Sequence, residues 1–118
     1  MTKLFLLTPN FPDKKLSESD LYFCPDCAMI EGVLSYYPQL REKVDITYVD
    51  FETPRLPIID LVGKDYQGCP ILIIHKGDMD DKDLKENEFR TSGDYYFLYR
   101  NTTIAQYFAR KYGVAWPH

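Results

Sequence analysis

Two cysteines three positions apart, Cys24 and Cys27, are the residues whose types and spacing point most directly to chemistry. The segment after them carries apolar residues at the spacing of one buried helical face: Ile30, Val33, Leu34 and Tyr37. Pro25 suits the first position of a helix, because the N–H that it lacks would have no partner there. The pair is therefore predicted to open a helix, with Cys24 near the N-cap.

A cysteine at a helix start is expected to be nucleophilic. Free backbone N–H groups and the positive end of the helix dipole stabilise a thiolate at Cys24. One turn of helix brings the sulfur of Cys27 close enough to form a disulfide. Asp26 opposes the thiolate, because its carboxylate is a like charge. We expect a nucleophilic Cys24 in a pair that is less strongly oxidising than one with histidine or tyrosine at position 26.

Two other interpretations of the pair stay open, half of a zinc site and two inert cysteines at a helix start. A zinc ribbon or knuckle needs a second C-x-x-C unit or an H-x₃₋₅-H unit. The chain has one further cysteine, Cys69, and its two histidines, His75 and His118, are far apart. The pattern therefore favours redox chemistry, with metal binding as an alternative.

Length and composition predict one globular domain, residues 1–118. Hydrophobic residues make up 45% of the chain, and 18 acidic against 14 basic residues give a net charge of −4. No basic stripe is present to bind a phosphate backbone, which argues against nucleic acid as a partner. The apolar run near the N-terminus is too short for a signal peptide or a membrane span. An odd number of cysteines without an export signal favours a cytoplasmic protein.

The elements that position the cysteines follow from local patterns. Short apolar or β-branched runs predict four strands, the last of them at a sheet edge: residues 3–8, 44–51, 71–74 and 95–99. The first two strands flank the cysteine helix, so they are predicted to be parallel in a βαβ unit.

Proline, glycine and capping residues indicate where the helices begin and end. The cysteine helix is predicted to end at Tyr37, ahead of Pro38. A short helix is expected up to residue 62 before Gly63, and a last helix, capped by residues 101–103, up to residue 112. Residues 9–23 are predicted to be a long loop, either a functional one or a solvated insertion, and residues 75–94 are predicted to be a solvated loop.

This order of elements resembles the thioredoxin fold. The stretch from Tyr22 to Cys27 resembles the aromatic-plus-C-P-x-C active site of glutaredoxins, and Gly68-Cys69-Pro70 is similar to the segment that carries the cis-proline of that superfamily. Residues 101–113 resemble the last helix of the N-terminal domain of glutathione transferases. The resemblance implies an α/β, thioredoxin-like fold with a four-stranded mixed sheet flanked by about three helices. As a whole the chain resembles small bacterial thioredoxin-like proteins of unknown function.

The resemblance implies a role for each matching residue around the cysteines. Cys24 would be the attacking thiol and Cys27 the resolving one. Tyr22 would be an aromatic packing wall beside them or, as the alternative, an activating phenol. Pro70 would be cis, and the backbone of Cys69 would pair with an extended thiol peptide.

Glutathione would bind at the start of the last helix. Asn101 and Thr102 would hold its γ-glutamyl carboxylate, as helix starts commonly hold anions. Lys14 or Lys15, in the loop ahead of the cysteines, would meet the other carboxylate. Asn101 departs from the relatives, which usually carry an acid there.

The predicted function is a cytosolic thiol–disulfide oxidoreductase that needs no organic cofactor and uses glutathione or a protein disulfide as co-substrate. Cys69 is the main departure, since relatives carry Thr, Val or Ile there. It could be a second resolving thiol, the third ligand of a metal or iron–sulfur centre with Cys24 and Cys27, or a small buried residue. The alternative functions are therefore a metal or iron–sulfur binding protein and a non-catalytic interaction module.

Overall fold

Apolar runs of the sequence form the central strands of an α/β fold in the computed structural model, which describes residues 1–118. Five strands form a mixed sheet in the order β4-β1-β5-β7-β6. Their bounds are β1 Thr2–Leu7, β4 Val44–Val49, β5 Ile71–His75, β6 Arg90–Ser92 and β7 Tyr95–Tyr99. β1 and β4 are parallel, as predicted, while β5, β7 and β6 each run antiparallel to their neighbours.

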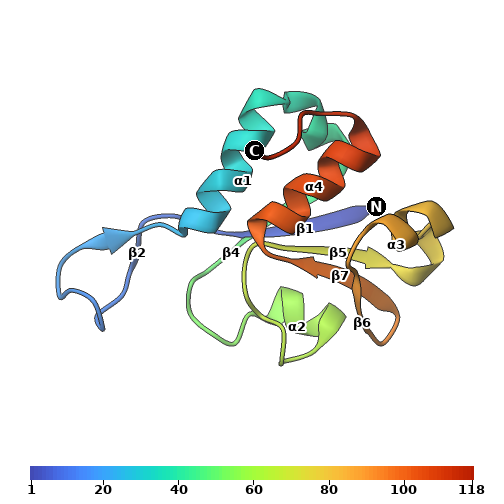
Figure 1. The fold of residues 1–118 in the computed structure, drawn as a ribbon. Helices are drawn as coiled ribbons and strands as arrows, with labels where there is room; N and C mark the ends of the chain where they lie inside the picture. Colours follow the sequence, from blue (N-terminus) through green and yellow to red (C-terminus); the bar gives the residue numbers. More distant parts are fainter.

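Helices cover both faces of this sheet (Figure 1). The four α-helices are α1 Pro25–Tyr36, α2 Leu56–Val62, α3 Asp81–Glu86 and α4 Asn101–Tyr112, with 3₁₀ turns at Pro38–Glu42 and Lys76–Asp78. α1 and α4 lie side by side on one face, and α2 lies on the other (Figure 1). None of these helices has the length and apolar character needed to cross a membrane.

The strand and helix counts correct the expectation of four strands and about three helices. β7 was expected at the sheet edge, but it lies between β5 and β6, and β6 is the edge strand. Residues 75–94, predicted to be a solvated loop, contain a 3₁₀ turn, α3 and β6. These elements are too short to show a hydrophobic period, so contacts with the rest of the chain stabilise them. For example, the buried Asp83 of α3 has its carboxylate 2.6 Å from the ammonium of Lys111, which belongs to the last helix, α4.

The stretch predicted as a loop ahead of the cysteines contains a short hairpin. β2 (Phe11–Pro12) pairs antiparallel with β3 (Leu21–Tyr22), and the hairpin projects from the body of the protein (Figure 1). Its base is held by the ring of Phe11, which stacks on Phe51 with centroids 4.4 Å apart. The hairpin therefore follows the end of β1 and leads directly into the cysteines at the start of α1.

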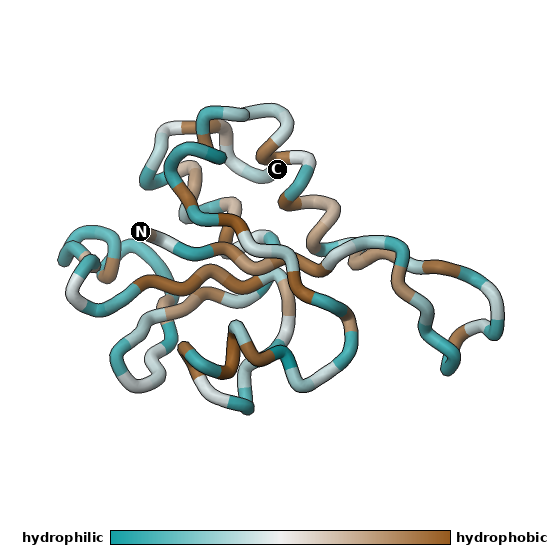
Figure 2. The backbone as a smooth tube through the Cα atoms, turned by 180° about the vertical axis from the view of Figure 1, so that it is seen from behind, coloured by the Kyte–Doolittle hydropathy of each residue, from teal (hydrophilic) through white to brown (hydrophobic).

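The core lies between the sheet and its helices. Runs of hydrophobic residues follow the central strands (Figure 2). In β5, Ile71, Leu72, Ile73 and Ile74 are all buried. This run predicted a buried strand, and the structure confirms it, since β5 has a neighbour on each side.

Strand register brings distant segments to one edge of the sheet. Phe5 pairs with Ile71, and Ile71 pairs with Tyr99, so the end of β1, the start of β5 and the end of β7 lie together. Leu7 pairs with Val49, which adds the end of β4. The C-x-x-C unit, the Cys69-Pro70 segment and the start of α4 all adjoin these strand ends, and they form the candidate site.

Candidate active site

Cys24 is the N-cap of α1, as predicted. Its backbone is extended, with φ −78° and ψ 113°, and its carbonyl accepts a hydrogen bond from the N–H of Ala28 at 2.9 Å. The Cys24 sulfur accepts a hydrogen bond from the N–H of Cys27 at 3.2 Å. The first turn of α1 therefore directs a backbone N–H at this sulfur.

Cys27 lies one turn further along and faces the core. Only 4% of its surface is exposed, and its sulfur accepts a hydrogen bond from the N–H of Leu7 at 3.4 Å. Burial, followed by the hydrogen bond with Cys24, raises the pKa of Cys27 far above that of a free thiol. The two sulfurs therefore differ, with one accessible and the other held as a buried thiol.

An open, mainly apolar pocket of about 520 Å³ gives access to this pair. Its walls are Leu7, Pro9, Phe23, Cys24, Cys27, Ala28, Glu31 and Tyr48. Phe23 is 60% exposed, so its ring offers an apolar contact next to Cys24. The Tyr48 hydroxyl donates to the Glu31 carboxylate, which also accepts from Arg41 at 3.1 Å.

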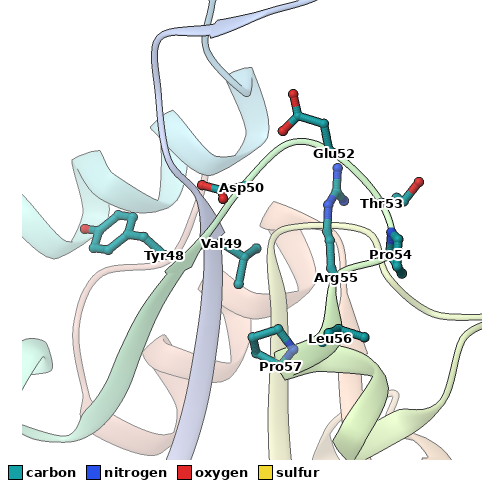
Figure 3. Close-up of a pocket in the computed structure, with 9 residues that line it drawn as sticks. All are labelled: Tyr48, Val49, Asp50, Glu52, Thr53, Pro54, Arg55, Leu56 and Pro57. Carbon is teal, nitrogen blue, oxygen red and sulfur yellow. The ribbon is translucent and has the colours of Figure 1, made fainter.

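A second pocket, of about 390 Å³, adjoins the first at Tyr48 (Figure 3). It lies between the end of β4 and the start of α2, with Tyr48 on one side and Thr53 and Pro54 on the other (Figure 3). It contains no cysteine, and Tyr48 is the residue that it shares with the cysteine pocket.

Cys69 and Pro70 lie against the pair from the start of β5. The Cys69–Pro70 peptide bond is cis, which confirms the prediction, and Pro70 is buried. The Cys24 sulfur lies 3.9 Å from the carbonyl oxygen of Cys69, within reach of a weak S–H hydrogen bond. Burial raises the pKa of Cys69 to about 11, although the positive charge of Arg55 opposes this rise.

The three cysteines do not form a ready metal site. No group of three or more His, Cys, Asp or Glu side chains is placed to hold a metal ion. Cys24 meets the backbone of Cys69, and the sulfur of Cys27 points toward Leu7. The ligand set proposed as an alternative from Cys24, Cys27 and Cys69 is therefore not assembled in this structure.

The other residues predicted for the site, Tyr22, Asn101 and Thr102, differ in how they relate to the cysteine pair. Tyr22 belongs to β3, where it pairs with Phe11, and Phe23 takes the place beside Cys24 that was expected for Tyr22. Asn101 donates to the Asp26 carboxylate at 3.2 Å, so it links α4 to the C-x-x-C unit. Its side-chain oxygen accepts from the backbone N–H of Thr102 at 2.7 Å. The last helix is capped by Arg100 rather than by Asn101, which is its first helical residue.

Comparison with known families places this chain in one of them. Residues 1–116 match the family described as "Protein of unknown function (DUF3088)". The chain belongs to this family. No curated protein and no solved structure matches it. The family description assigns no activity, so the function has to be argued from the site.

Two site residues were missed in the sequence, Arg90 and Arg100. Both line a pocket of about 320 Å³ that also contains Cys69, Pro70 and Asp26. Arg90 starts β6, a strand that was not predicted, so nothing placed it near the cysteines. The position of Arg100 was a weak indication that it belongs to the site, because it directly follows the predicted strand at residues 95–99 and precedes the predicted helix cap.

The burial of these thiols predicts selective alkylation. Under limiting iodoacetamide at pH 8, Cys24 should be modified first, and Cys27 only after unfolding. Cys69 should react at least about tenfold more slowly than Cys24, because a raised pKa leaves little thiolate at pH 8. Its rate should keep increasing up to a pH of about 11. Peptide mapping of the alkylated protein measures each rate, and equal rates at Cys24 and Cys27 would contradict the assignment.

Proposed function

We propose that the protein is a thiol–disulfide oxidoreductase in which Cys24 attacks and Cys27 resolves. The observation that carries the proposal is the difference between two sulfurs on one helical turn. Cys24 opens to a pocket at the N-terminus of α1, while Cys27 is 4% exposed and remains a thiol. An enzyme of this kind needs one exposed nucleophile and one protected thiol within reach of it.

We further propose that the fold is thioredoxin-like, which supports the same activity. The C-x-x-C unit lies between β1 and β4, which are parallel. The strand β5, which is antiparallel to β1, begins directly after the cis-proline Pro70. A last helix then packs beside the cysteine helix (Figure 1). The arrangement agrees with the family resemblance drawn from the sequence.

The reaction starts with the thiolate of Cys24. It attacks one sulfur of a substrate disulfide, so a new S–S bond forms at Cys24 and half of the substrate leaves as a thiolate. The released thiolate takes up a proton. Cys27 then loses its proton, attacks the Cys24 sulfur and displaces the second half of the substrate as another thiolate, which is protonated in turn. Two electrons pass from the cysteine pair to the substrate; one proton comes from Cys27, the second comes from the solvent that took up the Cys24 proton when the thiolate formed, and a 24–27 disulfide remains.

A small thiol such as glutathione is the proposed reductant of that disulfide, and a protein disulfide is the proposed alternative co-substrate. No organic cofactor is required, because sulfur carries the electrons throughout. An extended substrate chain would pair with the backbone of Cys69, next to the cysteine pocket, by β-strand addition.

The proposal predicts a reversible disulfide between Cys24 and Cys27. Protein equilibrated in glutathione buffers of increasing oxidised fraction should show the 24–27 linkage by alkylation and mass spectrometry, and dithiothreitol should reverse it. Metal analysis of the same sample is the control for the metal-binding alternative. If strongly oxidising buffers produce no disulfide between Cys24 and Cys27, the proposed oxidoreductase function is wrong.

A further inference from the structure

Two arginines at the site have no partner in the protein. The chain has five arginines, and three of them are engaged: Arg41 with Glu31, Arg55 with backbone carbonyls, and Arg110 with Asn87. Neither Arg90 nor Arg100 has a carboxylate within ion-pair distance. Both are exposed, yet they line the same pocket beside Cys69 and Pro70.

The sheet brings these two positive charges together. Arg90 pairs in register with Phe97, and Arg100 follows Tyr99 at the end of the same strand, β7. Arg90, Tyr99 and Arg100 line the same pocket, so both guanidinium-bearing residues and the Tyr99 phenol border one space. Two like charges repel each other when they share a pocket, unless an anion lies between them.

The backbone at Arg100 supports a ligand role. Its φ is +73° and its ψ is 138°, a conformation that side-chain-bearing residues rarely adopt and that glycine adopts readily. Strained residues of this kind gather at functional sites. The arginine also caps α4, whose positive dipole end adds to the field in the pocket.

Neither of the two acidic residues that line these pockets, Asp26 and Glu88, forms an ion pair with Arg90 or Arg100. Asp26 lines the same pocket, but its carboxylate accepts the hydrogen bond from Asn101. Glu88 lines a smaller adjoining pocket of about 110 Å³ with both arginines, and it forms no ion pair with either.

We propose that Arg90 and Arg100 form a subsite for a carboxylate of the small thiol that exchanges with the Cys24–Cys27 pair. This subsite rests on the proposed oxidoreductase function. Guanidinium groups present planar pairs of donors that match a carboxylate. The pocket of about 320 Å³ touches Cys69, whose carbonyl faces the Cys24 sulfur, so the carboxylate and the reacting sulfur of one small molecule can be bound together.

The test compares two thiols that differ in charge. Protein carrying the 24–27 disulfide is reduced with 3-mercaptopropionate or with neutral 2-mercaptoethanol, and the rate is followed by quenched alkylation. In Arg90→Gln and Arg100→Gln the rate with 3-mercaptopropionate should fall by about three- to tenfold each. The rate with 2-mercaptoethanol should not change. Added salt should weaken the preference of the unmodified protein for the anionic thiol.

Two further variants separate the subsite from general effects. Lys43→Gln removes the same charge at the opposite end of the sheet, just before Val44 starts β4, and both rates should stay unchanged. Arg100→Gly removes the guanidinium and relieves the positive φ. It should melt at or above the temperature of the unmodified protein and still lose the preference for 3-mercaptopropionate.

A binding measurement keeps this subsite independent of the redox reaction. Succinate, a dicarboxylate without sulfur, should shift the amide NMR signals of Gly68, Cys69 and residues 99–102 in the reduced protein, and the shifts should vanish in the Arg90→Gln/Arg100→Gln double variant. Unchanged rate ratios together with no succinate shifts overturn the subsite and leave the oxidoreductase function standing. If no 24–27 disulfide forms, that function fails, and the succinate titration alone decides for or against the subsite.

Discussion

Cys24→Ser is expected to reduce disulfide reductase activity to the rate measured without protein, whereas Cys27→Ser should accumulate a mixed disulfide at Cys24. The serine hydroxyl at position 24 cannot attack a disulfide, because only a thiolate is nucleophilic enough. In Cys27→Ser the first step still runs, but no second thiol releases the substrate. Insulin reduction measures the activity, and intact mass spectrometry detects the trapped adduct.

Cys69→Ser is the matched control for both variants. The Cys69 carbonyl, which faces Cys24, is retained in this variant, and the lost thiol has a pKa raised by burial to about 11. We therefore expect activity close to that of the unmodified protein. Equal loss of activity in all three variants, with no trapped adduct in Cys27→Ser, would favour metal ligation by the three cysteines instead.

Phe97→Ala is expected to lower the free energy of unfolding by about 3–5 kcal/mol. The Phe97 side chain is completely buried in β7, and its ring lies 4.7 Å from that of Tyr66 and 5.5 Å from that of Tyr99. Its removal leaves a cavity in the core next to the ring of Tyr99, which lines the pocket at Cys69. Such a loss is a large fraction of the roughly 5–15 kcal/mol that stabilises a typical domain. Urea unfolding followed by circular dichroism measures it.

Tyr36→Ala provides the control for this core variant. It also removes an aromatic ring, but the Tyr36 side chain is 81% exposed at the end of α1. Its effect on the free energy of unfolding should stay within about 0.5 kcal/mol. Comparable losses in the two variants would mean that Phe97 is not part of the core.

The sequence alone determined those parts of the site that depend on neighbours along the chain. The spacing of Cys24 and Cys27, Pro25 at the first helical position and the apolar period after them led to a helix capped by Cys24, and the structure has it. The four aliphatics from Ile71 to Ile74 led to the central strand in the same way. Such patterns can be read because a helical turn or a strand repeats every few residues.

The register of the sheet, by contrast, decided which residues reach the cysteines. The Cys24 sulfur meets the carbonyl of Cys69, 45 positions away, and Asp26 meets Asn101, 75 positions away. The expectation that Cys69 and Asn101 belong to the site came from the family resemblance. No local pattern in the chain could have placed them there. Strand pairing sums many weak contacts between distant segments, so its register does not show in either segment alone.

The difference between the two thiols and the presence of Arg90 and Arg100 in one pocket depend wholly on the tertiary structure. Cys27 is a buried thiol because β1 lies against the first turn of α1 and supplies the Leu7 N–H. Arg90 lines the same pocket as Arg100 because a three-residue edge strand, too short to show a period, pairs with β7. A residue's type and spacing set the chemistry that it can perform, but desolvation and neighbouring charge depend on packing between elements that are far apart in sequence.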